Sequence, residues 1–137
     1  MRKRLLLLLF AQLVARGAIA GEPVAVIAYA GMPKTDVAAL QRLYTGRSVS
    51  IGQLSAVPIN LPVGHPVRQS FLESLLGQND EQYTAYWLVR RYVGKGAPPK
   101  ELADVGEVLD YVRNTPGAVG YLPQSSVPPG VNVIFRR

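Results

Sequence analysis

The sequence predicts an α/β domain in which a mixed sheet is flanked by helices. Short apolar runs rich in β-branched residues alternate along the chain with segments whose apolar residues recur every three or four positions. The first pattern is typical of buried strands and the second of amphipathic helices, and their alternation favours layers of helix and sheet. The 137 residues suffice for one domain, and a hydrophobic share of 48% with 18% charged residues excludes a disordered chain.

The fold is expected to begin with a strand and a helix. Residues 24–29 form a continuous apolar run with β-branched members, which predicts a buried strand. Apolar residues at helical spacing predict a helix over 37–44, with Thr35 or Asp36 as its N-cap. Gly46 is placed to end this helix in the left-handed conformation, which glycine adopts without strain.

A second strand and a second helix follow. Residues 47–55 are expected to form a loop, and the apolar run over 57–61 predicts a strand. Pro58 is tolerated in that strand only at an end or an edge of the sheet, because it donates no hydrogen bond. The next helix begins at the Gly-His-Pro turn of 64–66, since Pro is favoured at the first helical position, and it ends at Gly77.

A third helix is expected to run from Asn79 or Asp80, one of which caps it, through Tyr92. Trp87 completes an apolar face of this helix, so we expect its side chain to be buried. The helix is followed by a loop over 94–99 that is rich in Gly and Pro.

One more helix and two strands complete the expected domain. Asp104 and Glu107 have the spacing of a capping box for a helix whose apolar residues recur up to Val112. Short apolar runs over 118–122 and 131–135 predict the last two strands. The full order is therefore strand, helix, strand, three helices and two strands.

The first twenty residues have the pattern of a secretory signal peptide. A basic stretch at 2–4 is followed by an apolar stretch at 5–15 and by the small-residue pattern Ala-Ile-Ala at 18–20, which predicts cleavage near Ala20. An uncleaved membrane anchor is the alternative, and it is disfavoured because a spanning helix needs about 20 apolar residues and Arg16 interrupts this stretch. Cleavage would lower the net charge from +6 to +2, because four of the 15 basic residues lie in this segment.

Composition excludes several classes of function. The chain has no Cys and a single His, His65, so a disulfide scaffold, thiol catalysis, a Cys-ligated zinc site and a multi-His metal centre are excluded. The small charge after processing argues against nucleic acid as a partner. No nucleophile, base and orienting group can be assembled around Ser70 and His65, so we expect no enzyme, no cofactor and no metal.

Six short segments, taken together and in order, carry a resemblance to a known family. They are LYTGR at 43–47, VPINLP at 57–62, RQSF at 68–71, YW at 86–87, GKGAPP at 94–99 and GAVGY at 117–121. The ordered set resembles the short phosphate ABC transporter substrate-binding-like proteins. The resemblance implies a reduced, one-lobed type 2 periplasmic binding-protein fold, a single PBP-like domain over residues 21–137 located in the periplasm.

The resemblance also implies an anion site at the start of the helix that follows the second strand. Full-length phosphate receptors place a Ser-Gly-Thr turn there, flanked by Arg, whereas this chain lacks both hydroxyls and Pro66 lacks a backbone donor. The candidate ligand-binding residues are Gly64, His65, Val67 and Arg68, with free helical N–H groups and the charges of Arg68 and protonated His65. The alternative is an ordinary helix start with an exposed His65 and a solvated Arg68.

Two functions from different classes remain. The first is a periplasmic solute-binding-like protein for phosphate or a related oxyanion, linked to ABC-type phosphate uptake. The second is a non-transport periplasmic interaction or sensory-input module that retains the fold without tight ligand binding. The expected partners are phosphate or a similar small anion, with an ABC permease, a sensor or a second copy that completes the cleft. We expect no nucleic acid partner and no membrane span after signal cleavage.

We predict that the exported protein lacks its first twenty residues. The basic, apolar and small-residue segments have the order that signal peptidase substrates share. Intact-mass spectrometry of periplasmic material should therefore give a chain that begins close to Gly21. A full-length mass in that fraction would contradict the prediction.

Overall fold

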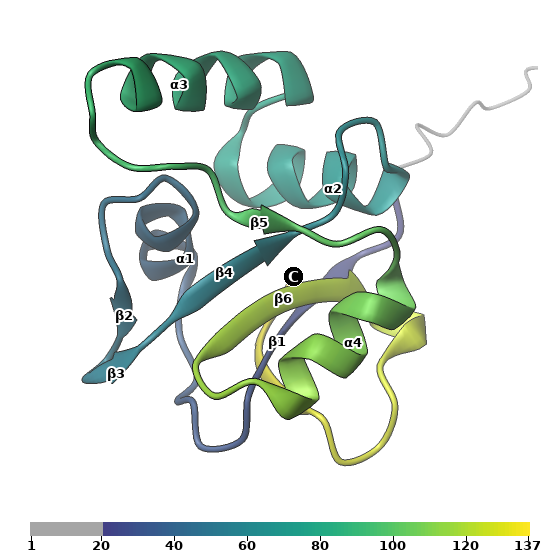
Figure 1. Ribbon diagram of the computed structural model, residues 1–137. Coiled ribbons are helices and arrows are strands. Elements are labelled where there is room, and N and C mark those ends of the chain that lie inside the picture. Colours follow the sequence, from purple (N-terminus) through teal and green to yellow (C-terminus); the bar gives the residue numbers. More distant parts are fainter. Residues whose placement is uncertain (1–20) are drawn as a thin grey trace, which may run out of the picture.

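A five-stranded mixed sheet forms the centre of the molecule (Figure 1). The computed structural model describes residues 21–137, so the predicted signal peptide over residues 1–20 lies outside the described part of the chain. The strand order is β5-β4-β6-β1-β7, with the bounds β1 Val24–Ala28, β4 Val57–Asn60, β5 Lys100–Glu101, β6 Ala118–Pro123 and β7 Asn132–Arg136. Strand β4 runs parallel to β5 and β6, whereas β1 is antiparallel to β6 and β7. The predicted mixed sheet is confirmed.

The helices begin where the sequence predicts caps. Their bounds are α1 Val37–Tyr44, α2 Pro66–Phe71, α3 Asp80–Tyr92 and α4 Val105–Asn114, and a π-helical turn, η1 Leu72–Leu76, continues α2. The side chains of Asp36, Asn79 and Asp104 accept hydrogen bonds from the third backbone N–H of their helices, so Asp36 and Asn79 are the caps. Within residues 21–137, no helix is long and apolar enough to cross a membrane.

Helices cover both faces of the sheet, as alternate residues of β6 demonstrate (Figure 1). Gly120 faces α4, where a Cβ on this glycine would lie only 2.7 Å from Cγ1 of Val108. Tyr121 faces the opposite way, and its ring stacks on Phe71 of α2 with the ring centroids 3.9 Å apart. The rings of Tyr44, from α1, and Phe71 meet edge to face, with their centroids 4.6 Å apart. The core therefore has a layer on each side of the sheet.

Three short elements are absent from the sequence prediction. The segment expected to be a loop contains a hairpin of β2 Ser50–Ile51 and β3 Leu54–Ser55. Strand β5 pairs with β4 through two residues only, and a 3₁₀ turn, η2 Gln124–Ser126, follows β6. Two- and three-residue elements are too short to produce a periodic pattern, because they form only when a partner strand or turn lies alongside.

The outermost helix, α3, is held against the end of α1. Trp87 is 5% exposed, which confirms its predicted burial, and its Nε1 donates to the carbonyl of Tyr44 at 3.3 Å. Gly46 has the predicted left-handed φ of +73°, and a Cβ there would lie 2.6 Å from Cη2 of Trp87. Tyr86 and Arg90 donate to the next two carbonyls of the same turn. Side chains of α3 therefore satisfy the carbonyl of the last residue of α1 and the carbonyls of the two residues that follow it.

Three buried tyrosines tie the sheet to the helices. The hydroxyl of Tyr44 donates to the carbonyl of Ile59 at 2.9 Å, and that of Tyr83 donates to the carbonyl of Tyr44 at 2.8 Å. The hydroxyl of Tyr121 donates to Oδ1 of Asn60 at 2.6 Å. Burial raises the pKa of Tyr83 to about 12 and raises the pKa of Tyr44 and of Tyr121 well above the usual value. These phenols therefore stay protonated and donate in the folded state.

We predict that Trp87→Ala lowers the free energy of unfolding by about 3 to 5 kcal/mol, because the truncation leaves a cavity against Gly46 and α1. Leu88→Ala is the matched control on the neighbouring position, where the side chain is 68% exposed. The control should change stability by less than about 0.5 kcal/mol. Urea melts of the two variants measure both changes. Equal losses of unfolding free energy in the two variants would contradict the role of Trp87 as a buried packing residue.

We predict that stability falls as the pH rises above about 10. The pKa of Tyr83 is raised to about 12 in the folded state, whereas tyrosine in an unfolded chain titrates near 10. Between these values the unfolded state loses a proton that the folded state keeps, so the free energy of unfolding decreases. Urea melts across this range should show a shallower decrease in Tyr83→Phe than in Tyr92→Phe, where the ring is 91% exposed. Identical profiles would contradict the prediction.

Candidate functional site

The residues predicted to bind an anion lie in the turn between β4 and α2 and at the start of α2. Gly64 is exposed and has a φ of +84°, a conformation that would strain any residue with a side chain. His65 is the N-cap of α2, and its Nδ1 accepts a hydrogen bond from the backbone N–H of Val67 at 3.1 Å. The backbone N–H of Val67 is therefore already hydrogen-bonded within the helix start. Nδ1 of His65 acts as an acceptor in this bond, so it does not donate to a ligand.

The two other predicted residues converge on a carboxylate. Gly64 N donates to Oδ2 of Asp80 at 2.8 Å, and Arg68 Nε donates to Oδ1 of the same group at 2.6 Å. Arg68 Nη1 donates in addition to the carbonyl of Leu61 at 2.9 Å. The donors that the sequence assigned to an oxyanion therefore hold an oxyanion of the protein itself, at the first residue of α3.

Asp80 is the residue of this site that sequence reasoning missed. The sequence singles it out only as a possible cap for the third helix, and Asn79 takes that role. A carboxylate in the first turn of a helix is favoured by the helix dipole whether or not it has a partner, so the pattern contains no signal for an ion pair. Arg68 and Asp80 lie twelve positions apart in the sequence, separated by the rest of α2, by η1 and by a turn, and only packing brings the two groups together.

The guanidinium of Arg68 is enclosed on several sides. Arg68 is 3% exposed, and its Nη1 also lies 3.6 Å from Oε2 of Glu101, the last residue of β5. Its central carbon lies 5.4 Å from the centroid of the Tyr83 ring, within the range of a cation–π contact. Two carboxylates thus face one cation. Within residues 21–137, no three His, Cys, Asp or Glu side chains gather closely enough to hold a metal ion.

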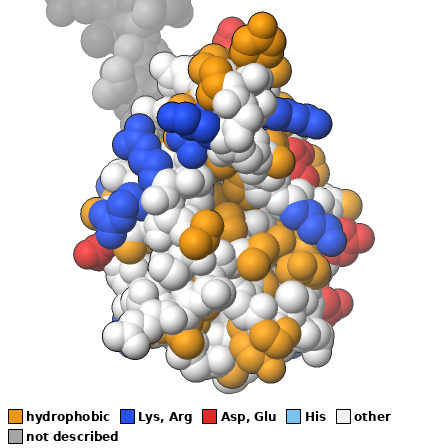
Figure 2. Space-filling model, turned by 60° about the vertical axis from the view of Figure 1, so that its left-hand side comes forward, with side chains coloured by type: hydrophobic (Ala, Val, Ile, Leu, Met, Phe, Trp, Pro, Cys, Tyr) orange, Lys and Arg blue, Asp and Glu red, His pale blue; other side chains and the backbone are white. Residues whose placement is uncertain are grey.

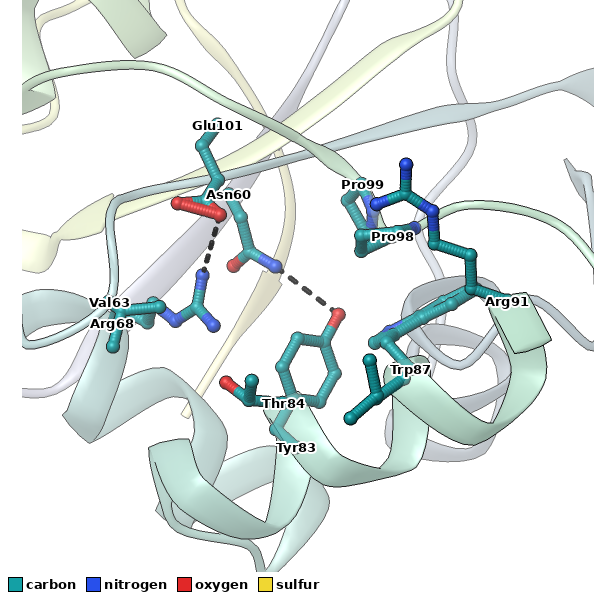
Figure 3. A pocket seen from close by; sticks show the side chains of 11 residues that line it. Asn60, Val63, Arg68, Tyr83, Thr84, Trp87, Arg91, Pro98, Pro99 and Glu101 are labelled. Atoms are coloured by element: carbon teal, nitrogen blue, oxygen red, sulfur yellow. Dashed lines mark hydrogen bonds and ion pairs between the residues drawn. The ribbon is translucent and has the colours of Figure 1, made fainter.

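A cavity of about 170 Å³ opens beside Arg68 (Figure 3). Helix α3 supplies one side of it, and the Pro98–Pro99 segment lies opposite. The lining residues are Asn60, Val63, Arg68, Tyr83, Thr84, Trp87, Leu88, Arg91, Pro98, Pro99 and Glu101. The cavity lies by the carboxyl ends of the parallel strands β4 and β5, which is where open α/β sheets generally bind ligands.

Asn60 marks the end of β4 within this cavity and is rigidly held. Its Nδ2 lies 3.2 Å from the hydroxyl of Tyr83, its Oδ1 accepts from Tyr121, and the residue is 1% exposed. The amide is therefore oriented by two phenols, one of which lines the cavity itself. The sequence predicts that Asn60 lies in a strand and includes it in the VPINLP segment, but a buried Asn has no pattern that assigns it to a cavity.

Comparisons with known proteins bear on the fold. No protein-family model and no curated protein sequence matches the chain. Among solved structures, an ABC-type phosphate transport receptor from Vibrio cholerae superimposes with a TM-score of 0.63 at 18% identity, over 82% of this chain and 45% of the receptor. A protein from Clostridium perfringens described as a "putative phosphate ABC transporter substrate-binding protein", with bound phosphate, superimposes with a TM-score of 0.63 at 17% identity, over 82% of this chain and 44% of that one.

The matched region and the sheet agree with the resemblance noted in the sequence. The chain spans less than half the length of each solved protein. Its strand order and flanking helices form a single α/β domain of the binding-protein type. The chain therefore has the fold of the phosphate ABC transporter substrate-binding proteins, in a partial and short form.

Proposed function

We propose that this protein is a periplasmic solute-binding protein that takes phosphate or a related small oxyanion beside Arg68, in ABC-type phosphate uptake. The observation that carries the proposal is the convergence of Gly64 N and Arg68 Nε on the two oxygens of one carboxylate. Donors spaced for two oxygens of one anionic group suit phosphate as they suit Asp80. The fold shared with two phosphate-related binding proteins supports the same ligand class and a role without catalysis.

Binding is expected to be weak, because Asp80 competes for the donors. Two unit charges 4 Å apart repel by about 4 kcal/mol at the effective dielectric constant of a protein surface. An external anion must displace the carboxylate or bind next to it through the remaining N–H groups of Arg68. The missing Ser-Gly-Thr hydroxyls lower the affinity further, by about two to four orders of magnitude for two lost hydrogen bonds to a charged group.

A second candidate is the non-transport interaction or sensory-input module. It is favoured by the outer face of α3 and the turn after it, where Leu88, Val89, Tyr92 and Val93 are 58% to 91% exposed. In Figure 2, hydrophobic side chains lie beside Lys and Arg side chains at the top of the molecule, the level at which Figure 1 places α3. Such a mixed surface suits a protein partner. Absence of anion affinity in the folded, unaltered protein would favour this candidate.

We predict that Asp80→Asn raises the affinity for inorganic phosphate by at least about tenfold, because it removes a negative charge that contacts both donors. Asn keeps the shape of the side chain and one acceptor oxygen. Isothermal titration calorimetry with phosphate, with sulfate and with a neutral solute measures the change. Phosphate should also raise the melting temperature of this variant more than that of the unaltered protein.

Two further variants control this experiment. Glu81→Gln removes an exposed charge from the same first turn of α3, and it should leave phosphate affinity unchanged. The double variant Arg68→Gln with Asp80→Asn removes both charges of the buried pair together, which avoids an uncompensated charge, and it should abolish the binding. Equal phosphate affinity in Asp80→Asn and in the unaltered protein would overturn the proposal.

A further inference from the structure

We propose that the cavity beside Arg68 selects organic anions that carry an apolar substituent about the size of an aromatic ring, in preference to inorganic phosphate. The inference rests on the proposed function and deepens it, because it assigns a substrate class to the same site. The side chains that line the walls of the cavity are mostly apolar, whereas those at its inner end are polar or charged.

The walls of the cavity are largely apolar. Val63 and Leu88 line it although they are 59% and 68% exposed, and the ring of Trp87 lies between α3 and the two prolines. A hydrated inorganic anion gains nothing from hydrocarbon walls and loses water where its oxygens approach them. An apolar substituent on the anion would cover these side chains and remove their surface from water.

Polar groups gather at the inner end and at one rim. At the inner end, Asn60 and Tyr83 are already hydrogen-bonded to each other, and Arg68 is paired with Asp80. The carboxylate of Glu101 also lines the cavity, 3.6 Å from Nη1 of Arg68, so the anionic group of a ligand must lie away from it. Arg91 lies beside Pro98 and Pro99 in Figure 3, and no ion pair involving it occurs among residues 21–137. A ligand that places its anionic group between these two arginines and its apolar part along α3 would therefore use both kinds of surface.

The size of the cavity sets the size of the substituent. A volume of about 170 Å³ is close to that of an apolar cavity of about 150 Å³, which accommodates benzene. Each buried methylene contributes about 0.8 kcal/mol, which corresponds to about a fourfold gain in affinity. Replacing a methyl group by a phenyl group should then raise affinity by at least about tenfold, even if the ring is only partly covered.

The test compares three anions with similar head groups and different substituents. Isothermal titration calorimetry of the protein with inorganic phosphate, methylphosphonate and phenylphosphonate is run at one pH at which all three are dianions. We expect phenylphosphonate to bind at least about tenfold more tightly than methylphosphonate. Leu88→Ser, which alters the cavity wall, should remove most of this preference. Val89→Ser is the matched control, because Val89 is 64% exposed on the same helix and does not line the cavity.

Each other outcome has a distinct meaning. Binding of phosphate with equal or weaker binding of phenylphosphonate overturns the inference and leaves the proposed function standing. If Leu88→Ser still binds phenylphosphonate more tightly than methylphosphonate by the same factor, the phenyl group does not lie against Leu88, and the inference is overturned. Equal affinity for benzyl alcohol and phenylphosphonate overturns the need for an anionic group, and absence of binding by all three anions overturns the inference and the proposed function together.

Discussion

The buried ion pair between Arg68 and Asp80 is the interaction on which the candidate site depends. A guanidinium that is 3% exposed needs a carboxylate partner, because a buried charge without one costs several kcal/mol. Asp80 also accepts from the backbone of Gly64, so a single carboxylate fixes the turn before α2 and the first turn of α3 together. The pair therefore positions the first turn of α3, together with the hydrogen bonds that Tyr83 and Trp87 make to the end of α1.

The same ion pair bears on how tightly the proposed site could bind an external anion. A buried Arg68 without a carboxylate partner would destabilise the fold, and Asp80 supplies that partner. If the protein binds an external anion as proposed, Asp80 would weaken that affinity, since both compete for the same donors. In the proposed site, apolar contacts along α3 would add affinity without competing with Asp80, because they involve Leu88 and Trp87 on a different wall.

Helix α3 connects the site to the core. Its inner face donates to carbonyls at the end of α1, and Trp87 approaches Gly46 too closely to allow a side chain there. Tyr83 lies on the same face and orients Asn60 from above, while Tyr121 orients it from the sheet. The cavity is thus bounded by groups that the core has already positioned, which limits how far its inner end can rearrange around a ligand.

Local patterns in the sequence determined the fold class, the order of the long elements, their caps and the burial of Trp87. Each of these depends on residues within three or four positions of one another, as when Asp36 caps α1 through the N–H of Ala39. The presence of Arg68 at the start of α2 was equally visible. Tertiary structure alone decided that its partner is Asp80, that Asn60 faces a cavity and that β5 pairs with β4. Such contacts join residues a dozen or more positions apart, and they form only when packing of the core brings separate elements together.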